Sequence, residues 1–280
     1  MTSDTEYVQG VERAFAVIKA FTGAEPALTI AQVAQHANLT RAVARRYLLT
    51  LKKLGYVHQD GARFFLTPRL LDLGHAYLVT LNATDVAKPY LERIMKRLPN
   101  AESSSMAVLD GHDCVYVERA FTRRIISSNL AIGSRLPAHA VALGKVLLAY
   151  LSPNELENYF KTAALERHTS RTICDANKLR RVLRKIRSDG WGFADEEFVV
   201  GRRTIAAPIF DRQGRVTLAI NVAAAVALVS TREMLEEQLP VLLESAREIS
   251  FALGAKVEDV SRLQGASRRP HSPAEQSAAT

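Results

Sequence analysis

The sequence has few cysteines, no long apolar run and no acid between residues 28 and 57, and each shortage argues against a class of protein. Only Cys114 and Cys174 occur among 280 residues, and they form no CxxC pair, so neither a zinc cluster nor a disulfide framework is indicated. No apolar run approaches the ~20 residues of a membrane span, and the opening MTSDTEYVQG lacks the pattern of a secretory signal. With the reduced thiols that we expect, these features predict a cytoplasmic protein without membrane contact.

Length and composition indicate a globular protein of two domains, but the net charge does not identify its binding partner. A chain of 280 residues exceeds the ~100–200 residues of one domain, so we expect two domains. Hydrophobic residues make up 48% and charged residues 24%, which is typical of a globular protein. The net charge of +8 permits binding to nucleic acid, an anionic membrane or acidic ligands, and does not choose among them.

Residues 8–67 carry the signals of a winged helix-turn-helix domain. The spacing over residues 8–21 predicts a helix whose buried stripe is Val11, Phe15, Ile18 and Phe21. Thr29 can cap a second helix with Gln32 as its capping-box partner, and Thr40 can cap a third after a tight turn at Asn38. Asp60-Gly61 between two β-rich runs predicts the hairpin that forms the wing.

The third helix, from Thr40 to Leu54, is the candidate for DNA recognition. Its inward stripe is predicted as Val43, Tyr47, Leu51 and Leu54. An α-helix fits the major groove of DNA, and residues near its start reach base edges. Arg41 and Arg45 lie four apart on one face, and a small residue between them, Ala44, would allow close approach.

The other DNA-binding candidates surround this helix. Arg46 lies about 100° from Arg45 and is expected to reach phosphate or an internal acid. Lys52 at the far end, Arg63 in the wing, and Thr29 and Gln32 are suited to phosphate. The predicted set is Thr29, Gln32, Thr40, Arg41, Ala44, Arg45, Arg46, Lys52 and Arg63. Solvated charges on a surface helix, or a wing that binds protein or RNA, are the alternatives.

The rest of the chain divides into three segments. Residues 68–82 predict a linker helix, whose apolar spacing (Leu70, Leu73, Tyr77 and Leu81) favours pairing with a second copy. Residues 83–254 interleave strand and helix patterns, which indicates an α+β domain. Residues 255–280 are rich in Ala, Ser and Pro and are predicted to be a disordered tail.

Several stretches together resemble the IclR family of bacterial transcription factors. They include GVERAFAVIKAF, LTIAQVAQHANLTRAVARRYLLTLKKLGYV, GSRLPAHAVALGKVLLAYL and GWGFADEEFVVGRRTIAAPIFD. The stretch SSSMAVLDGHDCVYVERAFTRRI is most similar to the Pca/Pob branch, whose members control the catabolism of aromatic acids. The resemblance implies a winged helix-turn-helix domain joined by a helical linker to a GAF-like effector-binding domain. It also implies a homodimer formed through the winged domain, or a homotetramer.

The resemblance further implies an effector pocket between the sheet and the loop before Gly144-Lys145. Carried over position by position, the pocket residues are Ser128, Asn129, Leu130, Ala142, Asp195, Arg202, Arg203, Thr204 and Asn221, with Ala194 beside them. Arg202 stands where family members often carry leucine, and His139 and Leu143 stand where the aromatic branch often has Tyr or Met. These departures leave the identity of the effector open.

An organic acid needs an apolar wall and a fixed cation, and arginine binds carboxylates in a bidentate way. Arg123, Arg124, Arg202 and Arg203 are the candidates. One of Arg202 and Arg203 can bind the ligand while the other pairs with the Asp195–Glu197 triplet; alternatively, both neutralise that triplet. Ser128, Thr204 and Asn221 can orient a small ligand. His139 either contacts an anionic ligand or is a buried capping residue.

Enzyme motifs fail on inspection. A phosphate loop needs glycine five positions before Gly144 and Ser or Thr after Lys145, but His139 and Val146 stand there. We therefore expect no enzyme activity, no cofactor and no metal. The predicted function is a transcriptional regulator whose binding to a double-stranded DNA operator is controlled by a small organic acid, aromatic or keto. The alternatives are a DNA-binding scaffold without ligand control, or a small-molecule enzyme.

Overall fold

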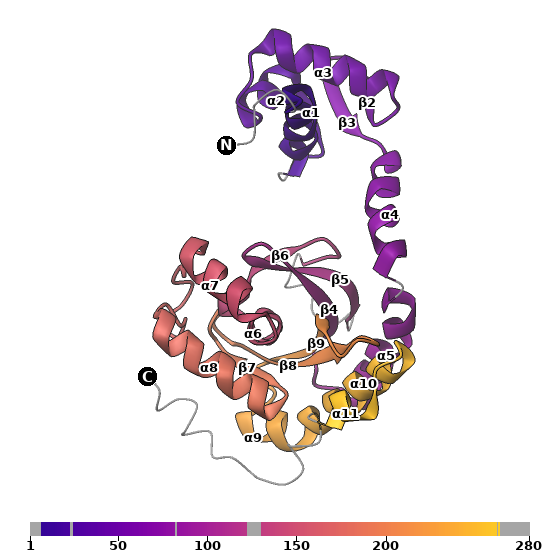
Figure 1. Ribbon diagram of the computed structural model, residues 1–280. Coiled ribbons are helices and arrows are strands. Elements are labelled where there is room, and N and C mark those ends of the chain that lie inside the picture. The colour runs from indigo at the N-terminus through magenta and orange to yellow at the C-terminus, as the bar shows by residue number, and fades with distance from the viewer. Residues whose placement is uncertain (1–6, 23–24, 82, 122–129, 262, 264–280) are drawn as a thin grey trace. The chain divides into compact units, whose positions relative to one another are not determined.

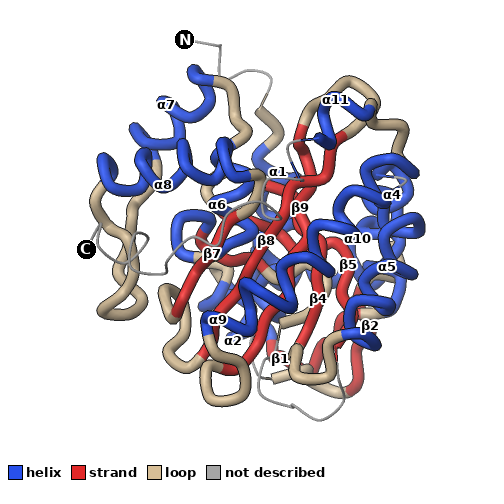
Figure 2. The backbone as a smooth tube through the Cα atoms, turned by 90° about the horizontal axis from the view of Figure 1, so that it is seen from below, coloured by secondary structure: helices blue, strands red, loops and turns tan. Residues whose placement is uncertain are grey.

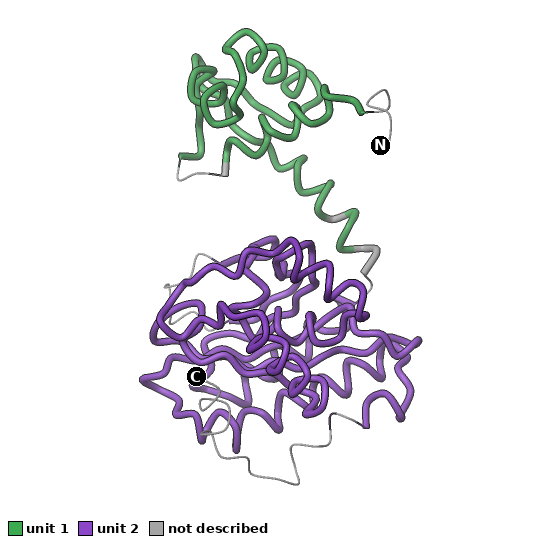
Figure 3. Tube along the Cα trace, turned by 60° about the vertical axis from the view of Figure 1, so that its left-hand side comes forward, with its two compact units in different colours: residues 1–81 green, residues 82–280 purple. Residues whose placement is uncertain are grey.

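The computed structural model describes residues 7–22, 25–81, 83–121, 130–261 and 263. The chain forms two compact units, residues 1–81 and 82–280 (Figure 3). The linker expected at residues 68–82 becomes a 3₁₀ turn, η2 (Pro68–Leu70), and helix α4 (Leu71–Leu81), both within the first unit. Ser128, Asn129, Arg123, Arg124 and the tail from residue 264 lie outside the described residues.

The first unit is a winged helix-turn-helix domain, as predicted (Figure 1). Its elements are α1 (Gln9–Lys19), η1 (Ala20–Thr22), β1 (Ala27–Thr29), α2 (Ile30–His36), α3 (Arg41–Lys53), β2 (Val57–Asp60) and β3 (Arg63–Leu66). The antiparallel sheet has the order β1-β3-β2. Asn38, at φ 53°, makes the turn between α2 and α3, and Gly61, at φ 54°, makes the turn of the wing.

The core of the first unit corrects both predicted helix stripes. Helix α3 buries Ala44, Leu48 and Leu51, whereas Leu54 is 51% exposed. The helix carries two adjacent apolar stripes, and the one with the small Ala44 packs inward. Helix α1 buries Val17, while the predicted Val11 and Phe15 are 54% and 50% exposed in the single chain; the predicted Phe21, in η1, is buried.

The second unit is built on one antiparallel sheet with the strand order β6-β5-β4-β9-β8-β7. The strands are β4 (Ser103–Asp110), β5 (Asp113–Phe121), β6 (Arg135–Pro137), β7 (Gly192–Asp195), β8 (Arg202–Phe210) and β9 (Val216–Ala225). The other elements are α5 (Ala83–Arg97), η3 (Ala138–Ala140), α6 (Ala142–Ala149), α7 (Pro153–Thr162), α8 (Ala176–Asp189), α9 (Thr231–Glu233), the π-helix η4 (Met234–Gln238), α10 (Leu239–Ala252) and α11 (Val257–Val260). The α+β class is confirmed.

Helices cover both faces of this sheet. Helices α5 and α10 pack side by side on one face, and α6 packs on the other with α8 outside it (Figures 1 and 2). Helix α6 begins very close to η3, because a Cβ added to Gly144 would lie 2.2 Å from Ala138 Cα. This close approach brings residues 140–143 over the centre of the sheet.

One expectation outside the sheet needs correction. The tail was predicted to be disordered from residue 255, but residues 257–260 form α11, and Val260 and Leu263 are buried. Two apolar side chains that pack on the domain outweigh the polar composition around them.

Candidate functional site

The outer face of α3 carries three arginines. Arg41, Arg45 and Arg46 are exposed, and no ion pair joins any of them to a residue that the structure describes. Thr40 caps the helix, because its Oγ1 accepts a hydrogen bond from the Val43 N–H at 3.3 Å. The start of α3 therefore presents free guanidinium groups beside a fixed helix end.

Ala44 does not belong to this surface. Its side chain is fully buried in the core of the first unit, so the prediction that it contacts DNA is wrong. A residue four positions from Leu48 shares its inward face, while Arg41 and Arg45 are exposed at the edge of that face. Ala44 instead allows the neighbouring elements to approach α3 closely.

Thr29 and Gln32 are committed to the capping box of α2. The Thr29 N–H donates to Gln32 Oε1 at 2.9 Å, and the Gln32 N–H donates to Thr29 Oγ1 at 3.4 Å. Gln32 Nε2 also donates to Glu25 Oε2 at 3.0 Å. Their first role is to fix the start of α2.

Lys52 connects α3 to the wing. Its Nζ donates to Gln59 Oε1 at 3.0 Å, and Gln59 Nε2 donates to the Gly61 carbonyl at 2.9 Å. Arg63, which follows the turn, is exposed. These hydrogen bonds fix the position of the wing relative to the end of α3, and each of the two elements carries a cationic side chain, Lys52 and Arg63 respectively.

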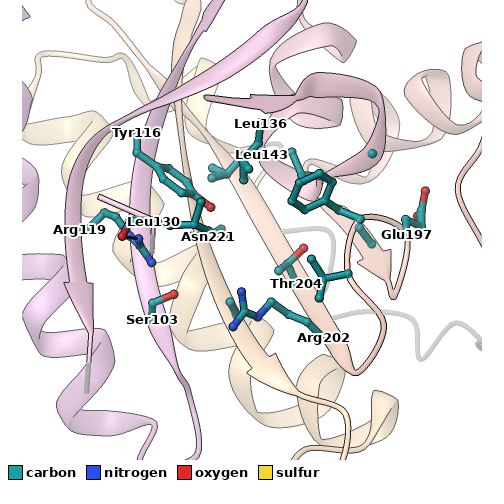
Figure 4. A pocket seen from close by; sticks show the side chains of 16 residues that line it. Ser103, Tyr116, Arg119, Leu130, Leu136, Leu143, Glu197, Arg202, Thr204 and Asn221 are labelled. Carbon is teal, nitrogen blue, oxygen red and sulfur yellow. Dashed lines mark hydrogen bonds between the residues drawn. The ribbon is translucent and has the colours of Figure 1, made fainter. Parts of the chain in front are cut away.

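A pocket opens in the second unit between the sheet and the start of α6 (Figure 4). Its apolar wall is made mainly by Leu130, Leu136, Val141, Leu143, Phe198 and Val199. Its polar side is made by Ser103, Tyr116, Arg119, Arg202, Thr204 and Asn221 from strands β4, β5, β8 and β9, and by Glu197, which follows β7. An apolar slot with few polar groups is the usual form of a small-molecule site.

A bulge in β5 brings Arg119 into this pocket. Met106 of β4 pairs with Glu118 and the next residue, Ala107, pairs with Tyr116, so Val117 is the extra residue. Without the bulge, Tyr116 and Arg119 would point to opposite faces of the sheet. With it, the Arg119 guanidinium lies 4.8 Å from the centre of the Tyr116 ring. The sequence analysis did not identify Arg119.

Arg119 is the cation of the pocket that has no acid partner among the described residues. Its Nε donates to Ser105 Oγ at 3.1 Å and its Nη1 donates to the Leu130 carbonyl, while Nη2 donates to no described residue. Burial lowers the pKa of Arg119, Tyr116 opposes this effect, and the charge of Arg202 lowers the pKa further. The acid that lines the pocket, Glu197, is paired with Lys145, so Arg119 leaves the lining with one positive charge that no described acid balances.

Neutral donors complete the polar side. Asn221 Oδ1 accepts the Ser105 N–H at 3.0 Å, which leaves its amide nitrogen without a hydrogen bond in the described part of the chain. Thr204 and Tyr116 point toward the same space (Figure 4). Burial raises the pKa of Tyr116 to about 12, so its hydroxyl stays protonated and can donate.

Of the predicted pocket residues, Leu130, Arg202, Thr204 and Asn221 line the pocket, and so does Ala194. Arg203 and Asp195 do not, because alternation along β8 puts Arg203 on the other face and the register pairs it with Asp195. Arg203 Nε lies 3.1 Å from Asp195 Oδ1, and its Nη1 donates to the Val229 carbonyl at 3.0 Å. Arg203 is therefore the internally paired arginine.

Two more residues that were predicted to line the pocket, Ala142 and His139, do not line it. Ala142 is buried at the start of α6, and its neighbours Val141 and Leu143 line the pocket instead. His139 is 2% exposed, and its Nε2 donates to the Glu166 carbonyl at 2.9 Å. Burial lowers the pKa of His139, which fits the alternative of a neutral buried residue.

Lys145 does not approach the pocket as a free cation. Its side chain is fully buried, and its Nζ donates to Glu197 Oε1. Among the described residues, no group of three or more His, Cys, Asp and Glu side chains is arranged to hold a metal ion. None of the described helices is long and apolar enough to cross a bilayer.

A winged domain with a free arginine face, followed by a domain with a cationic ligand pocket, defines a ligand-responsive DNA-binding protein. The family model of the IclR helix-turn-helix domain matches residues 10–61, and that of the bacterial transcriptional regulator IclR C-terminal domain matches residues 75–251. The chain therefore belongs to the IclR family of bacterial DNA-binding transcriptional regulators.

The relatives that this chain resembles include regulators of the aromatic-acid branch. The chain is 40% identical over 253 residues to the Pca regulon regulatory protein of Pseudomonas putida, which covers 90% of this chain and 86% of that relative. It is 31% identical to the p-hydroxybenzoate hydroxylase transcriptional activator of Acinetobacter baylyi, with 87% and 91% covered.

Solved structures agree with this placement. A transcriptional regulator of Rhodococcus sp. RHA1 is 40% identical, with a TM-score of 0.79, covering 88% of this chain and 98% of that one. An IclR homolog of Microbacterium hydrocarbonoxydans, solved in complex with 4-hydroxybenzoate, is 25% identical, with a TM-score of 0.77, covering 87% and 98%.

Proposed function

We propose that this protein binds a DNA operator through α3 and the wing, and that a small organic acid in the pocket of the second unit controls this binding. The observation that carries the proposal is Arg119, a half-buried guanidinium without an acid partner among the described residues. A half-buried cation loses part of its hydration, and a bound carboxylate would offset that loss. A bacterial regulator of this kind acts in the cytoplasm, where its DNA lies.

An aromatic acid fits the pocket best. A carboxylate placed between Arg119 and Arg202 would accept charge-assisted hydrogen bonds, and the leucines and Phe198 would enclose a flat ring. Asn221, Thr204 and the Tyr116 hydroxyl would hold further oxygens of the ligand. The homologue solved with 4-hydroxybenzoate supports this choice of ligand class.

The protein acts as a homodimer in this proposal. Val8, the N-cap of α1, forms an exposed apolar stripe with Val11 and Phe15, and Leu73 and Tyr77 are exposed four residues apart on α4. Apolar rows of this kind at helical spacing are typical of helix pairing between copies. A twofold dimer would read two half-sites whose centres lie about one helical turn of DNA, or a multiple of it, apart.

The test combines two titrations of the full chain. A duplex selected from a random library by the protein is titrated by fluorescence anisotropy with and without 4-hydroxybenzoate, and ligand binding is measured by calorimetry. We expect sequence-specific binding that changes with the ligand. Equal affinity for selected and random duplexes would refute the DNA assignment, and absence of heat with benzoate, 4-hydroxybenzoate and 3,4-dihydroxybenzoate would refute the ligand assignment.

A further inference from the structure

One pocket side chain, Arg202, also forms an ion pair with Glu102, in the connection between α5 and β4. Arg202 Nε donates to Glu102 Oε2 at 2.9 Å, and the two side chains are 22% and 11% exposed. The two Nη nitrogens of Arg202 donate to no described residue, and Arg202 lines the pocket (Figure 4). The same guanidinium therefore faces an internal carboxylate on one edge and the ligand space on the other.

Glu102 ends the short connection between α5 and β4. Its backbone N–H donates to the Ala223 carbonyl at 2.8 Å, and its side chain reaches Arg202 on β8. Ala101 and Leu98, in the same connection, are buried. The connection is thus held to the sheet by one backbone bond to β9 and one ion pair to β8.

Helix α5 can transmit a movement of the α5–β4 connection toward the first unit. It starts at Ala83, directly after the first unit ends at Leu81. Arg97 Nη1 lies 2.5 Å from Glu244 Oε2, and Arg93 pairs with Glu248, so two ion pairs fix its last turns to α10. A 15-residue helix spans about 22 Å, and a small shift at its last turn moves its first turn.

We propose that Glu102 is the positioning residue through which the occupied pocket acts on α5. Without ligand, Glu102 holds Arg202 and the α5–β4 connection together. A ligand carboxylate that draws on the free edge of Arg202 adds a second negative charge to the same guanidinium, and the two carboxylates repel each other. The Glu102–Arg202 pair weakens, and the connection to α5 loosens. This inference rests on the proposed binding of an acid at Arg119 and Arg202.

The variant Glu102→Gln separates binding from transmission. It keeps the shape and the acceptor oxygen for Arg202, but removes the competing charge. We expect 4-hydroxybenzoate to bind about fivefold more tightly by calorimetry, because a like charge within a few ångströms has gone. We also expect the ligand-dependent change in affinity for the selected duplex to fall toward onefold. A side chain with only a structural role would not move these two quantities in opposite directions.

The matched control is Glu244→Gln. It removes an ion pair between α5 and α10 with the same change of side chain, but Glu244 does not line the pocket. Its ligand affinity should equal that of the wild type. The proposal is overturned if Glu102→Gln keeps the wild-type ligand effect on DNA binding, or if its ligand affinity is unchanged or weaker.

A second measurement on the unmodified protein does not depend on any variant. Hydrogen–deuterium exchange should show faster exchange at residues 98–104 when 4-hydroxybenzoate is added, while the strands of the pocket become protected. Protection of residues 98–104 by the ligand would overturn the proposal while leaving ligand binding itself established. Absence of any ligand effect in calorimetry would instead remove the proposed function.

Discussion

Replacing Arg119 with glutamine removes the pocket cation that pairs with no acid in the described chain. A hydrogen bond to a charged partner contributes about 1.5–3 kcal/mol, and each ~1.4 kcal/mol is a factor of ten in affinity. Arg119→Gln should therefore weaken binding of 4-hydroxybenzoate by about tenfold to a hundredfold. The shorter side chain also frees the Leu130 carbonyl, to which Nη1 donates, so the upper end of this range is expected.

The same substitution has a small cost in stability. It removes the stacking of the guanidinium on Tyr116, which is worth about 0.5–1 kcal/mol at a partly exposed site. The second unit should stay folded, and calorimetry on the folded variant measures the loss of binding directly. Arg135→Gln is the control, because Arg135 pairs with Asp110 and Asp113 and does not line the pocket. If Arg119→Gln binds the acid as tightly as Arg135→Gln does, the role given to Arg119 is wrong.

Three further predictions concern other parts of the chain. Arg45→Ala should reduce the free energy of DNA binding by about 1–3 kcal/mol and relax base preference at one position. Lys52→Ala should weaken binding to all sequences and reduce the dependence of DNA affinity on salt concentration. Gel shifts at several salt concentrations distinguish the two variants, and unchanged affinity in both would contradict the recognition-helix assignment. Arg203→Ala removes the bonds of Arg203 to Asp195 and to the Val229 carbonyl, while Asp195 keeps Arg171 as a partner. The variant should lose about 1.5–3 kcal/mol of unfolding free energy in urea titrations. A stable variant that no longer binds the acid would show that Arg203 belongs to the pocket after all. Burial raises the pKa of Cys114, Tyr116 and Tyr159 to about 12. Because the unfolded chain releases these protons first, their contribution to stability is fully present below about pH 9 and is lost as the pH rises toward 12. Urea midpoints that do not fall in this window, or that fall equally in Tyr116→Phe, would contradict this prediction.

Local signals in the sequence predicted the elements of the fold. The Thr29–Gln32 capping box forms as expected, and Gly61 makes the wing turn. These features depend on residues three or four apart, which a sequence displays directly. The buried face of α3 was predicted wrongly, since Val43 and Ala44 begin two parallel apolar rows and only the neighbouring helices decide between them.

The pocket was harder to predict because it depends on pairing between distant strands. The bulge at Val117 orients the Arg119 side chain toward the pocket, and no local sequence pattern predicts a bulge. The alternation of β8, by contrast, could have separated Arg202 and Thr204 from Arg203 once the strand was assigned. The resemblance to the family supplied Leu130, Thr204 and Asn221, while chemistry alone supplied the need for an arginine.

Operator binding by the full chain, followed as acid is added, tests the central claim most directly. Anisotropy of a labelled selected duplex should give two separate binding curves, without and with saturating 4-hydroxybenzoate, whose midpoints differ by about 5–150-fold. A single curve in both conditions, with calorimetry showing that the acid is bound, would mean that the pocket and the arginine face of α3 are not coupled.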